Sequence, residues 1–592
     1  MMQMRLKPLF FANVMVLTFA CTTATPRPHA GFYGGGFGIP PDFLYTQVKL
    51  ETNADGSLKG TLWQPYERVG GFPLGSILVD GPRLRFAFED MKFDLRQTGI
   101  GYRGIATRGG VKYPASFVIR PGSPPTQSLA PFEGTYDLGG GRTFTFSRNN
   151  ANGAPWFLEL PSGRTGYLYN ISPTEFVAGR CFYCVEPLAY RVALSVEGMR
   201  VNGRVVPRDT RIHEEHVTFS SADGTTIAGT LFLPRGAGPH PAVVFAHGSG
   251  AQTRNGFYGQ IRFMAEAYAR RGIAALAYDK RGTGASKGDW ERANFSALAD
   301  DLVAGVRLLR TRSDIDPQRI GLTGSSQAGL VIALALEHVT DVRLIQLRST
   351  AAPMGVLEQE RARIVLQMRA DGYPQPEIDR AVRIRDMMDD YAKTGAGWNE
   401  LATEFKKVER ELWAAHFLGG LPPQDSPDWP WLREAFTYDV TKYFERLPGS
   451  VQALYGARDT PIPPEESRAR LEAALKRGGS RDYELLVIPD ATHNYYVGRT
   501  GGDREFPALS RYVPGHFDMV VEWAVQALRP LIFQLSCAKR PAAPGRRGTR
   551  GRRTTRRSRR RRRSSPAPPG SGGGSSRPTS AGGRTSASKS MA

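Results

Sequence analysis

The eleven residues Arg319–Gly329 constrain the fold of this chain most strongly, because they predict a buried strand that turns sharply into a helix. Gly324, Ser326 and Ala328 follow the pattern small-x-serine-x-small. In this pattern the serine sits in a strained turn, and larger side chains two positions away on either side would collide. The helix expected over residues 327–338 is apolar on nearly every face and should be buried. Its free N–H groups and positive dipole end would then face the oxygen of Ser326.

The chain around this turn alternates strands with helices, which predicts a mostly parallel sheet covered on both faces. The predicted domain covers residues 211–530. Its strands are expected at 226–234, 241–247, 273–278, 342–348, 451–455 and 483–488, and its helices at 259–271, 297–312 and 519–528.

A long insertion interrupts this alternation at residues 355–445. It is charged, contains four tryptophans, and has a helical pattern at 359–370, 377–393 and 400–416. We interpret it as a helical cap over the domain. A plain surface excursion is the alternative.

The region before residue 208 has a different pattern, with short strands punctuated by Gly, Pro, Asn and Asp. Residues 41–207 predict an antiparallel all-β domain. A break near residues 121–131 would divide it into two small units, whereas without a break it would close into one barrel or sandwich. Residues 22–40 are rich in Pro and Gly and are predicted to be a linker.

Two residues downstream of Ser326 supply the partners that a serine nucleophile needs. A serine hydroxyl requires a base within hydrogen-bond reach and a carboxylate that orients the base. Asp459 follows one predicted strand and His493 follows the next, so both should lie at the edge of the sheet where Ser326 lies. Three neighbouring residues are weaker candidates. Asp490 is interpreted as a turn residue, and His516 comes too late in the order of the sheet. Ser325 is expected to point away from the site.

Two backbone segments are candidates for the oxyanion hole, which needs two N–H donors. Gln327 follows the nucleophile, and Gly248 or Ser249 lies in the glycine-rich loop after the first buried strand. His247 is expected to brace this loop. The turn at residues 278–286 lacks the Gly-Lys-Ser/Thr ending of a phosphate loop, so we assign it a structural hydrogen-bonding role.

As a set, these motifs resemble those of bacterial α/β-hydrolases of the carboxylesterase and serine aminopeptidase-like groups. The shared features are His247-Gly-Ser-Gly followed by Arg254, Tyr278-Asp-Lys-Arg-Gly-x-Gly-x-Ser, Gly324-x-Ser-Gln-Ala-Gly, Gly456-x-x-Asp459 and the late His493. The resemblance covers residues 213–530, and a weaker one links residues 60–88 to the N-terminal β domain of some exported esterases. It implies the α/β-hydrolase fold and hydrolysis of a small-molecule carboxylic ester through an acyl-enzyme, with no metal and no organic cofactor.

Two other functions remain open at this point. A peptidase related to prolyl oligopeptidases or serine aminopeptidases would use the same three residues. It would also need a binding site for a peptide amine or a proline, and no residue in the sequence indicates one. A non-catalytic binding protein on the same scaffold is the third alternative, and the complete set of catalytic residues argues against it. The long tryptophan-containing cap departs from the family pattern and leaves the substrate size undefined.

Both ends of the chain carry signals unrelated to this chemistry. Residues 1–21 resemble an export signal, with Arg5 and Lys7 before a short apolar stretch. Cleavage before Cys21 would give a lipid-anchored protein, and ordinary cleavage after Ala20 or Ala24 is the alternative. We therefore expect an exported protein that is periplasmic, membrane-anchored or secreted.

The high positive charge belongs to the C-terminal tail. Residues 538–592 hold 17 of the 78 basic residues and no acidic residue, so the rest carries +5 of the net +22. The Arg/Ser/Gly/Pro composition predicts disorder. The tail is either an electrostatic arm for anionic lipid, a polyanion or nucleic acid, or readthrough or out-of-frame sequence appended to a finished domain. We favour the second interpretation, and sequence-specific nucleic-acid binding is not expected.

The pair Cys181 and Cys184 has no second ligand pair, which argues against a zinc site. A local disulfide and two buried small residues are the interpretations left open.

Overall fold

The computed structural model describes residues 29–39, 42–64, 69–120, 129–149, 154–351, 353–435, 438 and 440–530. The predicted signal at residues 1–21 with Cys21, most of the predicted break at 121–131, and the tail at 538–592 lie outside the described residues. None of the described helices combines the length and the apolar character needed to span a bilayer.

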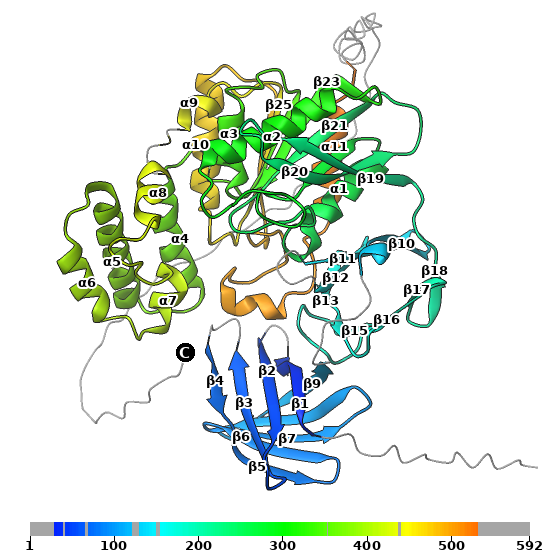
Figure 1. Cartoon of the computed structure of the whole chain (residues 1–592), viewed down its shortest axis with the longest axis vertical. Helices are drawn as coiled ribbons and strands as arrows, with labels where there is room; N and C mark the ends of the chain where they lie inside the picture. The colour runs from blue at the N-terminus through cyan, green and yellow to red at the C-terminus, as the bar shows by residue number, and fades with distance from the viewer. Residues whose placement is uncertain are drawn as a thin grey trace, which may run out of the picture. The chain divides into compact units, whose positions relative to one another are not determined.

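The first domain is one antiparallel sheet of nine strands (Figure 1). In chain order the strands are β1 (Gly31–Ile39), β2 (Asp42–Thr52), β3 (Leu58–Gln64), β4 (Val69–Pro73), β5 (Gly75–Asp80), β6 (Arg83–Phe88), β7 (Met91–Gln97), β8 (Gly101–Arg108) and β9 (Val111–Arg120). Their order in the sheet is β4-β3-β2-β1-β9-β8-β7-β6-β5. Because Leu74 alone connects the two edge strands β4 and β5, the sheet must curl around its own apolar core, which includes Leu62 and Phe93.

The predicted linker at residues 22–40 is wrong for residues 31–39, which form strand β1 between β2 and β9. Tyr33 and Phe37 are buried on one face of this strand. The intervening glycines permit close approach of the neighbouring strands, since a Cβ on Gly35 would lie 2.1 Å from the carbonyl oxygen of Ser116. The glycine-rich composition therefore reflects tight strand packing, whereas we had interpreted it as a linker.

Two smaller antiparallel sheets follow, and they share a second core that includes Phe144, Phe176 and Val192. After the short helix η1 (Ala130–Phe132), the first sheet contains β10 (Gly134–Gly139), β11 (Arg142–Arg148), β12 (Pro155–Leu160) and β13 (Arg164–Tyr167). The second contains β14 (Tyr169–Asn170), β15 (Glu175–Ala178), β16 (Tyr190–Ser195), β17 (Gly198–Val201) and β18 (Arg204–Val206). Cys181 and Cys184 form a disulfide in the loop before β16.

The third region has an eight-stranded sheet in the order β19-β20-β22-β21-β23-β24-β25-β26. Its strands are β19 (Ile212–Ser220), β20 (Thr226–Pro234), β21 (His240–Ala246), β22 (Ala274–Tyr278), β23 (Ile315–Ser325), β24 (Leu344–Arg348), β25 (Ser450–Gly456) and β26 (Tyr483–Ile488). Strand β20 is antiparallel to both of its neighbours, and the strands from β22 to β26 are parallel. The expected mostly parallel sheet of the α/β-hydrolase fold is confirmed.

Helices cover both faces of this sheet (Figure 1). Helices α2 (Phe295–Arg310), α3 (Ala328–Ala335) and α10 (Pro464–Arg477) share one apolar core with it, and α1 (Gln260–Arg270) and α11 (His516–Ala527) share the other. The short helices η2 (Phe257–Gly259) and η3 (Asp503–Ala508) precede α1 and α11. Burial on both faces explains why the parallel strands are almost wholly apolar.

The insertion between β24 and β25 is the predicted helical cap (Figure 1). It comprises α4 (Val356–Ala370), α5 (Gln375–Thr394), α6 (Trp398–Lys406), α7 (Leu412–Leu418), α8 (Asp428–Ala435) and α9 (Thr441–Phe444). The expected single helix at 400–416 is two helices, because a turn at 407–411 separates them. The cap has its own core, which includes Ile364, Phe405 and Trp413, so it is a folded unit rather than a loose excursion.

Candidate active site

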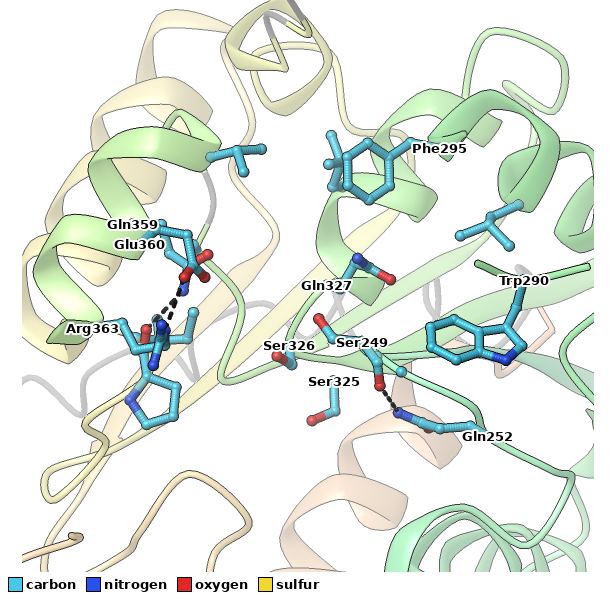
Figure 2. Close-up of a pocket in the computed structure, with 18 of the residues that line it drawn as sticks. Ser249, Gln252, Trp290, Phe295, Ser325, Ser326, Gln327, Gln359, Glu360 and Arg363 are labelled. Atoms are coloured by element: carbon cyan, nitrogen blue, oxygen red, sulfur yellow. Dashed lines mark hydrogen bonds and ion pairs between the residues drawn. The ribbon is translucent and has the colours of Figure 1, made fainter. Parts of the chain in front are cut away.

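A cavity of about 980 Å³ lies at the carboxyl ends of the parallel strands, between the sheet and the cap. Figure 2 shows Ser326 and Gln327 near its centre, with Gln359, Glu360 and Arg363 of helix α4 on one side and Trp290 on the other. The volume is at the upper end of the range for small-molecule sites. The cavity is therefore large enough for an organic substrate of considerable size.

The turn after β23 holds Ser326 in the left-handed region of backbone conformation, at φ +61°. Its N–H donates to the carbonyl oxygen of Arg348 on the next strand, at 3.0 Å. Gly324 is required here, because a Cβ at that position would lie only 2.4 Å from the Cβ of Ala328. This close approach is the steric reason that the sequence pattern requires small residues around the serine.

His493 and Asp459, which follow adjacent strands, are joined by hydrogen bonds. Nδ1 of His493 lies 2.9 and 3.0 Å from the two carboxylate oxygens of Asp459. The Asp459 side chain is fully buried and also accepts from the N–H of Ile462. Because a carboxylate only accepts hydrogen bonds, the proton of the neutral imidazole belongs on Nδ1, which leaves Nε2 as the free acceptor.

Ser326 and His493 both line the cavity, and in the described part of the chain no hydrogen bond joins their side chains. In unliganded sites such catalytic hydrogen bonds are often long and tighten when substrate binds. The structure therefore brings the predicted nucleophile and base to the same cavity, with the acid behind the base.

Among the backbone N–H groups of the cavity lining that have no hydrogen-bond acceptor within the described residues, three are candidates for the oxyanion hole. They belong to Gly248, Ser249 and Gln327, the positions predicted for the oxyanion hole. A Cβ on Gly248 would lie 3.6 Å from the Cβ of Ser326, so this loop passes close to the serine. Free donors on both sides of a serine can stabilise an oxyanion that forms at its hydroxyl.

Buried side chains hold the glycine-rich loop in this orientation. Lys280 Nζ donates to the carbonyl oxygens of Gly248 and Gly250, both at 3.0 Å, and Gln252 Nε2 donates to that of Ser249 at 3.0 Å. In a planar trans peptide the C=O and the N–H point in opposite directions. Holding the carbonyl of Gly248 therefore turns the N–H of Ser249 away from Lys280.

Lys280 has no ion-pair partner among the described residues, and burial lowers its pKa to about 8. In the sequence we had assigned its motif only a structural role, and the contacts of Lys280 and Gln252 with the loop were not anticipated. A lysine inside an otherwise glycine-rich turn was the available signal.

The structure also resolves the neighbouring candidates. His247 is buried and donates from Nε2 to the carbonyl oxygen of Tyr278 at 2.8 Å, and burial lowers its pKa to about 3. It therefore braces the loop as a neutral residue, as predicted. His516 is buried and stacked on Tyr495, away from the cavity lining, and Asp490 is an exposed turn residue at φ +55°.

One group of side chains in the described part of the chain has the spacing of metal ligands. Asp371, His416 and Asp503 each place one donor atom within 4.8 Å of the others. His416 Nε2 lies 2.9 Å from Asp503 Oδ2, and Asp371 Oδ1 accepts from the N–H of Arg504. These contacts join the cap to η3, so the donor atoms already have partners within the protein.

Comparison with known proteins agrees with this geometry. Residues 243–501 match the model of the alpha/beta hydrolase family. The chain is similar to the uncharacterized protein YfhR of Escherichia coli O157:H7, 29% identical over 25% of this chain and 50% of that protein. It is also similar to esterase EstD of Thermotoga maritima, 23% identical over 47% of this chain and 60% of that protein. The chain thus spans only about half the length of these relatives.

Among solved structures, hypothetical protein PA2218 from Pseudomonas aeruginosa is 18% identical, with a TM-score of 0.34 over 54% of this chain and 95% of that one. We rest the fold assignment on the strand order and the family match.

Proposed function

We propose that the chain, which matches the alpha/beta hydrolase family model over residues 243–501, is a hydrolase of that superfamily and cleaves carboxylic esters through an acyl-enzyme formed on Ser326. One observation carries the proposal. The strained serine lies beside free backbone N–H donors, and it shares its cavity with a histidine that is hydrogen-bonded to a buried aspartate. EstD, which is similar to 47% of this chain, is named an esterase.

The first half of the proposed reaction forms the acyl-enzyme. Nε2 of His493 takes the proton of Ser326 while Oγ attacks the ester carbonyl carbon. The oxyanion receives hydrogen bonds from the N–H of Gln327 and from that of Ser249 or Gly248. When the tetrahedral intermediate collapses, the C–O bond to the alcohol breaks and the imidazolium gives its proton to the departing alkoxide. Asp459 stabilises the imidazolium between these steps.

The second half regenerates the serine. A water molecule gives a proton to Nε2 of His493 and attacks the acyl carbonyl carbon. The same N–H groups receive the second oxyanion. Collapse of the second tetrahedral intermediate releases the carboxylic acid, and the His493 imidazolium returns its proton to Oγ of Ser326. The proposed reaction therefore requires no metal and no organic cofactor.

The charge nearest the serine favours ester cleavage over aminopeptidase activity. Lys280 is a buried cation that holds the glycine-rich loop beside the serine, and a cation there repels a substrate ammonium group. Among the carboxylates that line the cavity, Glu360 on cap helix α4 pairs with Arg363 at 2.9 Å, whereas Glu291 and Asp428 have no ion pair within the described residues. Those two are the positions at which an aminopeptidase would bind the ammonium group.

The test is a panel of p-nitrophenyl acyl esters beside aminoacyl and Xaa-Pro p-nitroanilides. We expect the wild type to hydrolyse the esters, and Ser326→Ala to lose activity by several orders of magnitude. Ser325→Ala is the matched control, which changes the adjacent serine and leaves the proposed triad intact. Equal activity of the wild type and Ser326→Ala would contradict the mechanism. Amide turnover above ester turnover would establish the peptidase instead.

We also propose that the protein is exported. The support is the signal-like sequence at residues 1–21 together with the Cys181–Cys184 disulfide, which is typical of an oxidising compartment. N-terminal analysis by mass spectrometry of the protein from its native host tests this. Cleavage before Cys21 with a lipid adduct is expected for an anchored form and cleavage near Ala20 or Ala24 for a free form. An intact Met1 would refute export.

A further inference from the structure

Arg348 is a buried cation beside Ser326 that has no ionic partner within the described residues. Arg348 is the last residue of strand β24 and is 6% exposed. It lines the cavity that contains Ser326. Its Nε is buried with no hydrogen bond, and within the described residues the guanidinium makes no ion pair. Its backbone is fixed, since its carbonyl oxygen accepts from the N–H of Ser326.

The position of Arg348 in strand β24 determines on which face of the sheet its side chain lies. Side chains alternate between the faces of a strand, and Gln346, two residues earlier, reaches the carbonyl oxygen of Val520 in α11. Arg348 therefore lies on the side of α1 and α11. Tyr258 of η2 and Gln260, the first residue of α1, also line the cavity. The cap lines the cavity with side chains from several of its helices, among them α4 and α5.

The surroundings of Arg348 do not neutralise its charge. The charge acts on the hydroxyls of Tyr268, Tyr495 and Tyr512, which are neutral groups. It also acts on His516, whose pKa is lowered to about 3 by burial and then by Arg348. A buried charge ordinarily requires an ionic or well hydrogen-bonded partner, because its desolvation is costly.

The other two arginines that line the cavity, unlike Arg348, each have a carboxylate partner. Arg385 pairs with Asp389 at 2.8 Å. Arg363 pairs with Glu360 and also donates to Gln367 and to the carbonyl oxygen of Phe417. Both are neutralised by neighbours on their own cap helices, whereas Arg348 is left for a group that enters the cavity.

We infer that Arg348 binds a free carboxylate of the substrate, so that the protein's substrates are esters carrying a second, anionic carboxyl group near the scissile bond. A guanidinium presents a planar fork of donors that matches a carboxylate bidentately. That the substrate is an ester follows from the proposed function, and this part of the inference rests on it. The carboxylate site at Arg348 is argued independently of the reaction.

Matched pairs of esters test the substrate class, with one pair for each side of the ester. On the acyl side, mono-p-nitrophenyl adipate is compared with p-nitrophenyl hexanoate. On the alcohol side, 4-acetoxybenzoate is compared with 4-acetoxybenzamide. In one of the pairs we expect kcat/KM to favour the carboxylate ester by about 10- to 100-fold, the range for a hydrogen-bonded charge pair.

Arg348→Met is the informative variant, because methionine keeps much of the side-chain length without the charge. We expect it to lower the carboxylate-to-neutral ratio by about 10- to 100-fold. It should fold, since replacing an unpaired buried charge with an apolar side chain is commonly neutral or stabilising. Glu360→Gln/Arg363→Met is the matched control, which removes a partnered cavity arginine together with its carboxylate and should leave the ratio unchanged.

A binding measurement separates this inference from the proposed function. Sodium hexanoate should raise the melting temperature of Ser326→Ala more than hexan-1-ol does, and the difference should vanish in Ser326→Ala/Arg348→Met. If this difference is found while the wild type hydrolyses no ester, the proposed function fails and the carboxylate site stands. If neutral esters are hydrolysed but Arg348 affects neither the ratio nor the melting temperature, the carboxylate site is refuted.

Discussion

Lys280→Met should impair the chemical step because Lys280 orients the loop that carries two of the free N–H donors. The amine donates to the carbonyl oxygens of Gly248 and Gly250 at 3.0 Å each. Hydrogen bonds from a charged group contribute about 1.5–3 kcal/mol each. Without them the loop can turn, and losing one oxyanion donor costs about 10²- to 10³-fold in kcat.

The kinetic signature distinguishes this effect from lost substrate binding. An oxyanion donor acts on the transition state, so kcat and kcat/KM should fall together while KM changes little. The assay is steady-state hydrolysis of p-nitrophenyl butyrate at pH 7. The control is Lys287→Met, which removes an exposed lysine directly after the turn at residues 278–286. A loss in kcat smaller than about tenfold in Lys280→Met would refute this role, since it would leave the oxyanion donors in place.

The pKa of Lys280 adds a pH dependence. Burial lowers this pKa to about 8, so the charged form that holds the loop is present below pH 8 and is lost above it. The kcat of the wild type should therefore decline above about pH 8. Lys280→Met should lack this alkaline decline, and an identical decline in both proteins would assign it to another group.

Three further predictions concern Asp459, the turn that holds Ser326 and the cap. Asp459→Asn should lower kcat on p-nitrophenyl butyrate by about 10³- to 10⁴-fold, because the amide stabilises the wrong tautomer of His493. Gly324→Ala should cost about 1–3 kcal/mol in urea unfolding through its contact with the Cβ of Ala328, and adding Ala328→Gly should restore part of the loss. Burial raises the pKa of Asp371 to about 6, so its contribution to stability is present at acidic pH and is lost as the pH rises through 6. Melting temperatures between pH 4 and 7 should show this loss in the wild type, and Asp371→Asn should lack it.

The sequence alone was sufficient for the parts of the site that depend on local rules. The small residues around Ser326 are required by a steric contact within five residues, between Gly324 and Ala328. Asp459 and His493 could be chosen because each follows an apolar strand, and parallel strands bring their carboxyl ends to one edge. The order of strands and helices was predictable for the same reason, since burial on both faces leaves an apolar run in the sequence.

Tertiary structure alone decided the features that depend on partners distant in the chain. Strand β1 was mistaken for a linker because its partner β9 lies some eighty residues further on, and a glycine-rich strand has little apolar pattern of its own. Whether Arg348 has an ion pair also depends on which side chains from α1, α11 and the cap reach the end of β24, and among the described residues none that is charged pairs with it. A sequence shows that a residue is charged, but the dielectric environment and the partners of that charge are set by packing, and these determine what the cavity around Ser326 can bind.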